Sequence, residues 1–430
     1  VYDELDIHFS FDKRLYSESD VTPELIDKLQ TLCTAKYDAP TYPVEEFRQT
    51  ILHEMKTEIH TMAELNDNFI GCIHRQLTDR HMLYTKEFTS DGCLAQDTFS
   101  GVLKVTVLVF NVLLDNTQYT LTVSGHPVGQ GVIAPNFNLM DTVKTAAGNA
   151  GASNAAGSAD NSCEAESVPA SAVATAGDSG VSGAGSAAAA GDSSTTGSSS
   201  AGNTVTASTR FKRLELHNHT VESDGSLTCQ ELTEYLAADH VDAFAITDHN
   251  TTSGQKKIEQ LLEEKHYPIS LIRGMEYTTY FGHILCLNLA KYVPWNSIDQ
   301  HRPERLFEAA REKGALVGIA HPFSYGDPFA RGCRFEMTIS DYSKVDFIEI
   351  FNNPEPLHEV NERGTNLWMS LIFSGYQITA TSGMDLHNRA KLAGCYATYI
   401  EGKNGGNIAS ELDTAIHTHR TWVSKGALLL

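Results

Sequence analysis

Apolar and polar residues follow different patterns in the two halves of this chain. In the first half, residues 5–11 alternate with a period of two, which is typical of a half-buried strand. Residues 101–112 and 118–123 also predict strands, whereas residues 44–65 have a helical pattern. We therefore predict a β-rich, sandwich-like domain with a helical insertion over residues 1–144.

Strand-like and helix-like segments alternate in the second half, residues 210–430. The apolar, strand-like segments are residues 213–216, 242–247, 269–273, 283–287, 315–320, 345–351 and 377–381. The helix-like segments between several of them are residues 228–240, 253–266, 303–313 and 361–374. This alternation predicts an α/β domain with a parallel sheet or barrel and outer helices. The functional residues of such barrels lie at the carboxyl ends of the strands.

Residues 145–209, between the two halves, are almost wholly Ala, Gly, Ser, Thr, Asn and Asp. The segment contains no aromatic residue, no Leu, Ile or Met, and no Lys or Arg. It cannot bury enough apolar surface to offset the conformational entropy lost on ordering its backbone. We expect a flexible linker or disordered insertion here, with no chemistry of its own.

Composition limits the partners of the protein. The formal charge of −22, from 32 basic and 54 acidic residues, argues against duplex nucleic acid and anionic membranes as partners. A small anionic substrate remains compatible, because bound cations can invert the local field. The sequence contains no apolar run long enough for a transmembrane helix. The oligomeric state is left open.

The 8 cysteines are scattered and form no CxxC pair, so a reducing compartment is the simplest expectation and a cytoplasmic location the default. The sequence does not decide whether further residues precede or follow this chain. The first residue is Val1 rather than Met, so a leader removed or missing at this end is compatible with the sequence. The chain stops at Leu430 soon after a strand-like segment, so further C-terminal structure is equally compatible.

Histidines and acids follow the strand-like segments of the second half in order. They are His217, His219, Asp224, His249, Glu276, His283, His321, Asp385 and His387. Imidazoles and carboxylates are the ligands of borderline divalent cations, and sites with bridging carboxylates usually perform hydrolysis. This set predicts a multinuclear metallohydrolase.

Two of these motifs carry a geometric argument. His217 and His219 are two residues apart, so on an extended strand both imidazoles point to the same face. The turn that follows can bring Asp224 back towards the strand end. At the next strand end, Asp248 and His249 could supply a ligand and the carboxylate that orients it, and we favour His249 as the ligand. Asp248 as the N-cap of a helix is the alternative.

At this point the motifs carry a family resemblance. HxHTxxSDG, ITDHN, GME, GHIL, AHP and GMDLH, in this order, resemble the PHP (polymerase and histidinol phosphatase) family over about residues 213–424. Residues 349–353 and 415–424 resemble its CehA/McbA, or carbaryl-hydrolase-like, branch. The resemblance implies a distorted seven-stranded (β/α)7 barrel that holds three divalent metals (Zn, Mn or Fe) and hydrolyses phosphoesters. The family's last motif usually has Ser where this chain has Met384, so this chain has no hydroxyl at that position.

The resemblance also implies a ligand set for each metal. Glu276 and Asp385 would be the shared carboxylates, binding metal rather than acting as free bases. The three implied sets are His217 and His219 with Glu276 and Asp385; Glu276, His283 and His321; and Asp224, His249 and His387. A metal-bound hydroxide would be the nucleophile, because coordination can lower the pKa of water to about 7.

Fewer signals bear on the substrate. Arg389 and Asn352 are candidates for substrate contacts, and Arg331 is more typical of a surface charge. The histidines of the first half have no ligand spacing, and we expect ordinary surface or core side chains. They are His8, His53, His60, His74, His81 and His126.

The sequence therefore predicts a metal-dependent phosphoesterase acting on a small phosphomonoester or phosphodiester, with nucleotides among the options. One alternative is a carboxyl or carbamate ester hydrolase. Another is a non-catalytic, metal-stabilised binding protein. An amidohydrolase with a carbamylated lysine is disfavoured, because no lysine stands at a strand end in the corresponding region.

Overall fold

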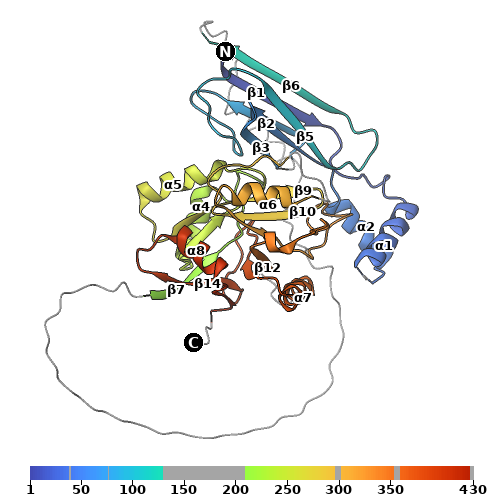
Figure 1. Ribbon diagram of the computed structural model, residues 1–430. Coiled ribbons are helices and arrows are strands. Elements are labelled where there is room, and N and C mark those ends of the chain that lie inside the picture. Colours follow the sequence, from blue (N-terminus) through green and yellow to red (C-terminus); the bar gives the residue numbers. More distant parts are fainter. Residues whose placement is uncertain (38–39, 76, 129–208, 296–301, 353–358, 427–430) are drawn as a thin grey trace, which may run out of the picture.

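The computed structural model describes residues 1–37, 40–75, 77–128, 209–295, 302–352 and 359–426. The predicted linker, residues 145–209, lies outside the described residues apart from Thr209. The described parts form a β-rich N-terminal domain and an α/β domain, which lie against each other (Figure 1).

The N-terminal domain contains two three-stranded antiparallel sheets, in the orders β4-β1-β6 and β3-β2-β5. Their strands are β1 Tyr2–Phe11, β2 Glu58–Leu65, β3 Asn68–Ile73, β4 Asp79–Tyr84, β5 Leu103–Asn111 and β6 Tyr119–Pro127. Alternate residues of β1 are buried, and Leu5 and Ile7 pack with Ala63 and Ile70 of the second sheet. The sheets therefore pack face to face, as the alternating pattern of residues 5–11 predicted.

The predicted helix over residues 44–65 is wrong in its second half. Helix α2, Val44–Glu54, ends before Met55, and Glu58–Leu65 forms β2. All six central residues of β2 are buried, so the strand has no exposed face and its sequence shows no period-two alternation. Another helix, α1 (Pro23–Tyr37), precedes α2, and both lie at one end of the sandwich (Figure 1).

The second domain is built on one nine-stranded sheet with the order β13-β12-β11-β10-β9-β8-β7-β14-β15. Its strands are β7 Thr209–Glu215, β8 Ala243–Ile246, β9 Ser270–Thr279, β10 Gly282–Leu287, β11 Leu316–Ile319, β12 Phe347–Asn352, β13 Thr379–Gly383, β14 Ala397–Lys403 and β15 Thr421–Ser424. Its two ends approach each other. The backbone N–H of Ser382 in β13 donates to Thr398 Oγ1 in β14 at 2.8 Å, and Thr421 Oγ1 in β15 donates to the carbonyl of Ala380 at 2.8 Å. The sheet is therefore nearly closed.

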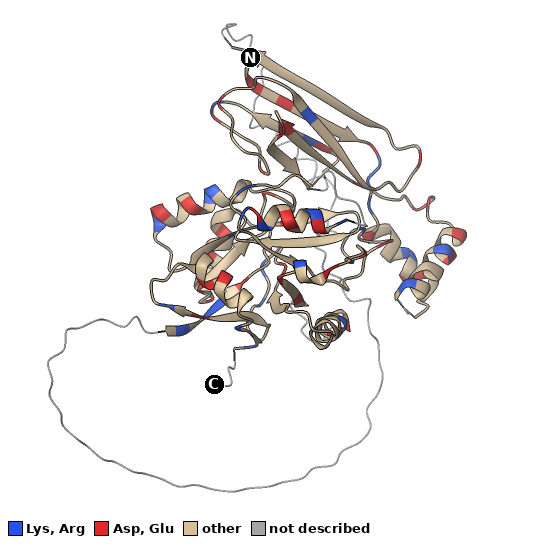
Figure 2. Ribbon diagram, in the orientation of Figure 1, with Lys and Arg blue, Asp and Glu red and all other residues tan. Residues whose placement is uncertain are grey.

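Helices follow several strands and lie outside the sheet (Figure 1). They are α4 Cys229–Ala238, α5 Ser253–Lys265, α6 Glu304–Arg311, α7 Glu359–Phe373 and α8 Ile408–His417, with a short 3₁₀ helix, η1, at Tyr342–Lys344. Charges of both signs are interspersed on α1, α5 and α6 (Figure 2). Among the described residues, no helix has the length and apolar character needed to cross a membrane.

Strand direction differs from the parallel arrangement that we predicted. Strands β7, β8 and β9 run parallel, as do β11, β12 and β13, but β10 is antiparallel to both β9 and β11. Only Tyr280 and Phe281 separate β9 from β10, and a parallel crossover needs about a dozen residues or more. The sheet is therefore mixed, and the hairpin brings Glu276 and His283 to neighbouring strands.

Candidate metal centre

The predicted ligands gather at one edge of the barrel. His217 and His219 follow β7 directly, His249 follows β8, and His321 follows β11. Carboxyl ends of parallel strands meet at the same edge of a sheet, and Glu276 and His283 join them from the β9–β10 hairpin. Asp385 and His387 follow β13, and Asp224 lies in the turn after β7. All nine predicted ligands therefore lie together, and all except the half-buried Asp224 are buried.

The first implied ligand set is assembled in the structure. His217 Nε2 lies 3.2 Å from Glu276 Oε2 and 3.3 Å from Asp385 Oδ1. His219 Nε2 lies 2.9 Å from the same Asp385 oxygen and 3.4 Å from the same Glu276 oxygen. Each of these four residues offers a ligand atom within 4.8 Å of the other three. One cation could therefore contact all four after small adjustments.

Glu276 connects this set with the second. Its Oε1 atom lies 2.9 Å from His283 Nδ1 and 3.0 Å from His321 Nε2. Its Oε2 atom, which faces His217 and His219, also lies 2.9 Å from His249 Nδ1. The two oxygens of this carboxylate thus point to different groups of imidazoles, as a bridging ligand requires.

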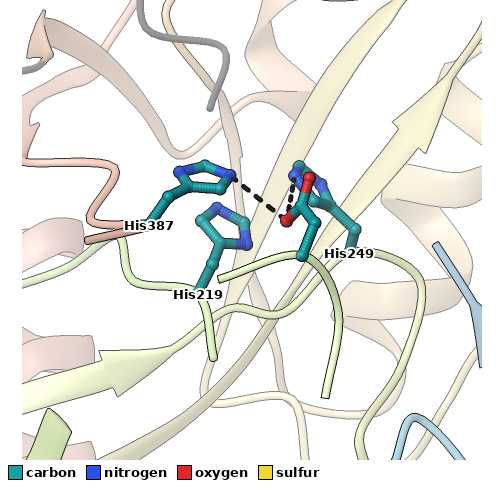
Figure 3. A group of neighbouring side chains, drawn as sticks. His219, His249 and His387 are labelled. Carbon is teal, nitrogen blue, oxygen red and sulfur yellow. Dashed lines mark ion pairs between the residues drawn. The ribbon is translucent and has the colours of Figure 1, made fainter. Parts of the chain in front are cut away.

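The third set surrounds Asp224. Its Oδ1 atom lies 3.2 Å from His387 Nε2 and 3.6 Å from His249 Nε2 (Figure 3). The His219 ring stacks between those of His249 and His387, with centroids 4.1 Å and 4.2 Å away (Figure 3). His219 therefore belongs geometrically to this group as well as to the first. The structure brings all nine residues together, and the binding of three metals stays a prediction.

Buried polar atoms that lack a hydrogen-bond partner indicate whether the cluster is suited to cations. Eight buried atoms at its centre have no hydrogen-bond partner among the described residues: His217 Nε2, His219 Nδ1 and Nε2, Asp224 Oδ1, His249 Nε2, Glu276 Oε2, Asp385 Oδ1 and His387 Nε2. Leaving one such group unpaired costs about 1–3 kcal/mol, so a native cluster of them needs an explanation. These are ligand-type atoms that face one another, so divalent cations fit this set.

The charges within the cluster are strongly coupled. Burial would raise the pKa of Glu276, but His217, His283 and His249 hold it well below its usual range. Burial would likewise lower the pKa of His387, but the Asp224 carboxylate raises it to about 10. The carboxylate is thus ionised and ready to bind a cation, whereas His387 must release a proton before it can do so.

Glu349 lies within β12 and contacts two predicted ligands, although the spacing of the sequence did not identify it. His217 Nδ1 lies 3.1 Å from Glu349 Oε1. The other oxygen, Oε2, accepts hydrogen bonds from the backbone N–H of His321 and the side-chain amide of Asn352, both at 3.0 Å. Glu349 therefore orients two predicted ligands. The only signal for it was its place in the motif of residues 349–353, of which 353 lies outside the described residues.

Asp248 organises the turn that carries Asp224. It accepts hydrogen bonds from the backbone N–H of Thr220 at 2.7 Å, from the Thr220 hydroxyl at 2.8 Å and from the Ser223 hydroxyl at 2.6 Å. Burial raises the pKa of this carboxyl to about 6. Thr252 is the N-cap residue of α5, so the alternative role of Asp248 as a helix N-cap is wrong.

The predicted substrate contacts have other partners in the structure. Asn352 Nδ2 donates to Glu349, and the exposed Arg389 lies over the Tyr235 ring. Arg331 forms an ion pair with Asp327 at 2.6 Å. Substrate binding by Arg389 and Asn352 therefore stays a prediction.

The N-terminal domain also reaches the cluster. His74 Nε2 lies 3.4 Å from Asp224 Oδ2, and the His74 ring stacks on that of His249 with centroids 4.1 Å apart. We expected an ordinary surface or core histidine at this position. No spacing in the sequence relates residue 74 to residues more than a hundred positions away, so only the packing of the two domains revealed the contact.

Comparisons with known proteins match parts of the chain. Residues 2–127 match the model of a family of unknown function, DUF6669. An uncharacterised protein of Methanocaldococcus jannaschii is 30% identical over 112 residues, which cover 26% of this chain and 58% of that protein. The 5'-3' exoribonuclease Rnm of Escherichia coli is 34% identical over 134 residues, which cover 27% of this chain and 45% of the enzyme.

The chain therefore spans about half the length of these two relatives. A solved structure from Bacteroides vulgatus, a two-domain protein containing a predicted PHP-like metal-dependent phosphoesterase, aligns with a TM-score of 0.38. It is 17% identical to this chain, and the match covers 50% of this chain and 65% of that one.

Proposed function

We propose that this protein is a metal-dependent phosphoesterase of the PHP type, with the distorted (β/α)7 barrel and the CehA/McbA-like affinity that its motifs imply. The observation that carries the proposal is the set of eight ligand atoms that face one another in the barrel and have no hydrogen-bond partner in the described part of the chain. Further support comes from Rnm, an exoribonuclease, which by its name cleaves phosphodiester bonds. The proposed substrate is a small phosphomonoester or phosphodiester.

The hydrogen bonds of three histidines fit a ligand role. The Nδ1 atoms of His217, His321 and His387 face the Glu349 carboxylate, the Cys333 carbonyl and the Asp385 carbonyl at 3.1, 3.1 and 2.9 Å. An oxygen acceptor requires that Nδ1 carry the proton, which leaves the lone pair on Nε2. Each Nε2 faces a carboxylate of the cluster, as is usual for metal-binding histidines.

The nine residues would hold three cations in the sets described above, with Glu276 and Asp385 shared. Bound cations of this kind would neutralise the phosphate charge and lower the pKa of a water molecule towards 7. The chain itself would supply orientation. Glu349 fixes the ring of His217, and Asp248 fixes the turn that presents Asp224. No side chain is required as a nucleophile.

The burial of the cluster favours the proposed hydrolysis. The cluster lies between the barrel edge and the N-terminal domain, where water is scarce and electrostatic interactions are strong. A covered site of this kind favours a small substrate, or the end of a longer one, over a duplex. The net charge of −22 favours the same class, because an acidic protein attracts polyanions poorly.

The test combines metal analysis with a substrate panel of an aryl phosphomonoester, an aryl phosphodiester and an aryl carboxyl ester. We expect about three metals in the barrel of each wild-type chain, so a total of at least three, and turnover of at least one phosphoester. His217→Ala should lose this turnover, whereas His53→Ala should behave as wild type because His53 is exposed on α2. Equal turnover by wild type and His217→Ala would contradict the proposal, and turnover of the carboxyl ester alone would favour the esterase alternative.

A further inference from the structure

The N-terminal domain is anchored on the two barrel loops that carry predicted ligands. The backbone N–H of Gly92 donates to Glu222 Oε2 at 3.0 Å, and its carbonyl accepts from Thr251 Oγ1 at 2.9 Å. Glu222 precedes Asp224 by two residues, and Thr251 follows His249 by two. Figure 1 shows β3 on the side of this domain that faces the barrel. The domain is thus attached next to the cluster.

Three ligand-type side chains of this domain face the same place. Glu58 and His60 are two residues apart on β2 and therefore share one face of the strand. Thr61 pairs with Ile73 in the antiparallel β2–β3 ladder, which sets His74 opposite His60. The His60 and His74 ring centroids are 3.9 Å apart, and His60 Nε2 lies 3.2 Å from Glu58 Oε1. Ligand atoms of these three residues all lie within 4.8 Å of one another.

The imidazoles of this group are buried and unsatisfied. Both nitrogens of His60, and Nδ1 of His74, have no hydrogen-bond partner in the described part of the chain. The exposed fraction of His60 is 0% and that of His74 is 4%. Two imidazoles and a carboxylate form a donor set that suits Zn²⁺, Fe²⁺ and similar cations. Buried ligand atoms without hydrogen-bond partners also characterise the barrel cluster, where there are more of them.

Asp224 joins this group to the barrel. Its Oδ2 atom faces His74 at 3.4 Å, while its Oδ1 atom faces His387 at 3.2 Å. We propose that Glu58, His60 and His74 form a further divalent-cation site, supplied by the N-terminal domain and adjoining the barrel centre through Asp224. This site is separate from the nine barrel ligands and does not depend on which reaction the barrel performs.

Cation counting in the full-length chain tests this proposal. Metal-free protein is saturated with Zn²⁺ and desalted, and Zn²⁺ per chain is measured by mass spectrometry for wild type, Glu58→Gln and His60→Gln. Both variants should bind about one cation fewer than wild type. His53→Gln is the matched control and should equal wild type, because His53 is exposed and belongs to none of the ligand groups of the described residues.

The same count in a His217→Ala background separates the two sites. The barrel variant should still lose about one further cation when Glu58→Gln is added, whether or not the wild type hydrolyses phosphoesters. Substitution of Co²⁺ for Zn²⁺ gives a second readout, since the visible absorption of the bound ion should change in Glu58→Gln. The near-isosteric Glu58→Gln decides the matter if His60→Gln unfolds. Wild-type cation content and an unchanged Co²⁺ spectrum in folded Glu58→Gln would overturn the proposal.

Discussion

Two regions of this molecule bring histidines and acids within metal-binding distance, and they differ in burial. On the N-terminal domain, His8 Nε2 lies 2.8 Å from Asp79 Oδ1, and the His8 ring stacks on that of His81 with centroids 4.1 Å apart. These three side chains are 29–66% exposed. The histidines of the barrel cluster are at most 2% exposed. Proximity is common to both groups, so it does not identify a metal site.

The difference lies in how the polar atoms are satisfied. At the surface, each imidazole has a carboxylate partner: His8 Nε2 lies 2.8 Å from Asp79 Oδ1, and His81 Nδ1 lies 2.9 Å from Asp6 Oδ1. Such exposed ion pairs contribute about 0–1 kcal/mol and need no cation. In the barrel, six imidazoles share three carboxylates, and eight buried atoms have no hydrogen-bond partner among the described residues. Buried and unsatisfied ligand atoms are therefore the stronger indicator of a cation.

The largest expected effect separates these regions directly. Both oxygens of the Glu276 carboxylate lie close to imidazoles of the cluster. Glu276→Gln removes the charge of this carboxylate, so cations should bind poorly. We expect phosphoesterase activity to fall by roughly a thousandfold, because several kcal/mol of charge stabilisation are lost. Steady-state kinetics and metal content measure the effect, and the exposed Glu312→Gln serves as control. Wild-type activity in Glu276→Gln would remove the distinction between the regions.

Metal removal should destabilise the protein mainly through the barrel cluster. Cations that bind only the folded state add about 2.7 kcal/mol when their concentration is a hundred times the Kd. Denaturant unfolding with and without Zn²⁺ should show an increment of this order in wild type. His81→Gln should keep the full increment and Asp385→Asn should lose most of it. An increment of equal size in all three proteins would show that the cation binds elsewhere.

Glu349→Gln sharpens the comparison within the barrel. The amide can still accept from His217 Nδ1, but it lacks the negative charge that orients the ring and makes Nε2 a better ligand. We expect cation affinity to fall by about 10- to 100-fold while the fold is kept. Calorimetric titration of metal-free protein measures this change, and an unaltered Kd would mean that Glu349 has no role in positioning His217.

A pH titration compares a buried carboxyl with the exposed acids. Burial raises the pKa of Glu215, at the end of β7, from 4.5 to about 8. Its contribution to stability is therefore complete below pH 4.5 and is lost as the pH rises towards 8. The metal-free protein should lose up to about 1.4 kcal/mol per pH unit in this window through Glu215. Glu215→Gln should flatten this slope, and denaturant unfolding at several pH values shows whether it does.

The smallest effect is expected at the surface group. His8→Gln should leave cation content and activity as in wild type and change the free energy of unfolding by less than about 1 kcal/mol, because water screens its pairing with Asp79. Mass spectrometry for metal and denaturant unfolding measure both quantities. Loss of a cation in this variant would mean that burial does not distinguish the two regions.

The contrast between the regions also explains what the sequence could predict. The strand ends at His217, His249 and His321 are local signals, since an apolar run that stops in a polar residue marks its own position. Parallel strands then bring these ends to one edge, so the cluster follows from local patterns and a general rule. The strands from β7 to β13 were predictable for the same reason, whereas β14 and α8 were not predicted.

Contacts formed between distant segments carried no such signal. β2 is buried along its centre, which removes the alternation that would identify a strand. The direction of β10 depends on a two-residue turn rather than on its apolar residues. The contact of His74 with Asp224 depends on how two domains pack. The alternation of apolar and polar residues along the chain indicates none of these features.

The most direct test of the account is anomalous X-ray scattering from crystals of the full-length chain loaded with Zn²⁺, measured at the zinc absorption edge. We predict three peaks within the barrel cluster, with neighbouring peaks about 3.5–4 Å apart, contacting Glu276, Asp385 and Asp224. Absence of any peak between His217 and Asp385, with the nine side chains placed as described, would contradict a multinuclear metal centre.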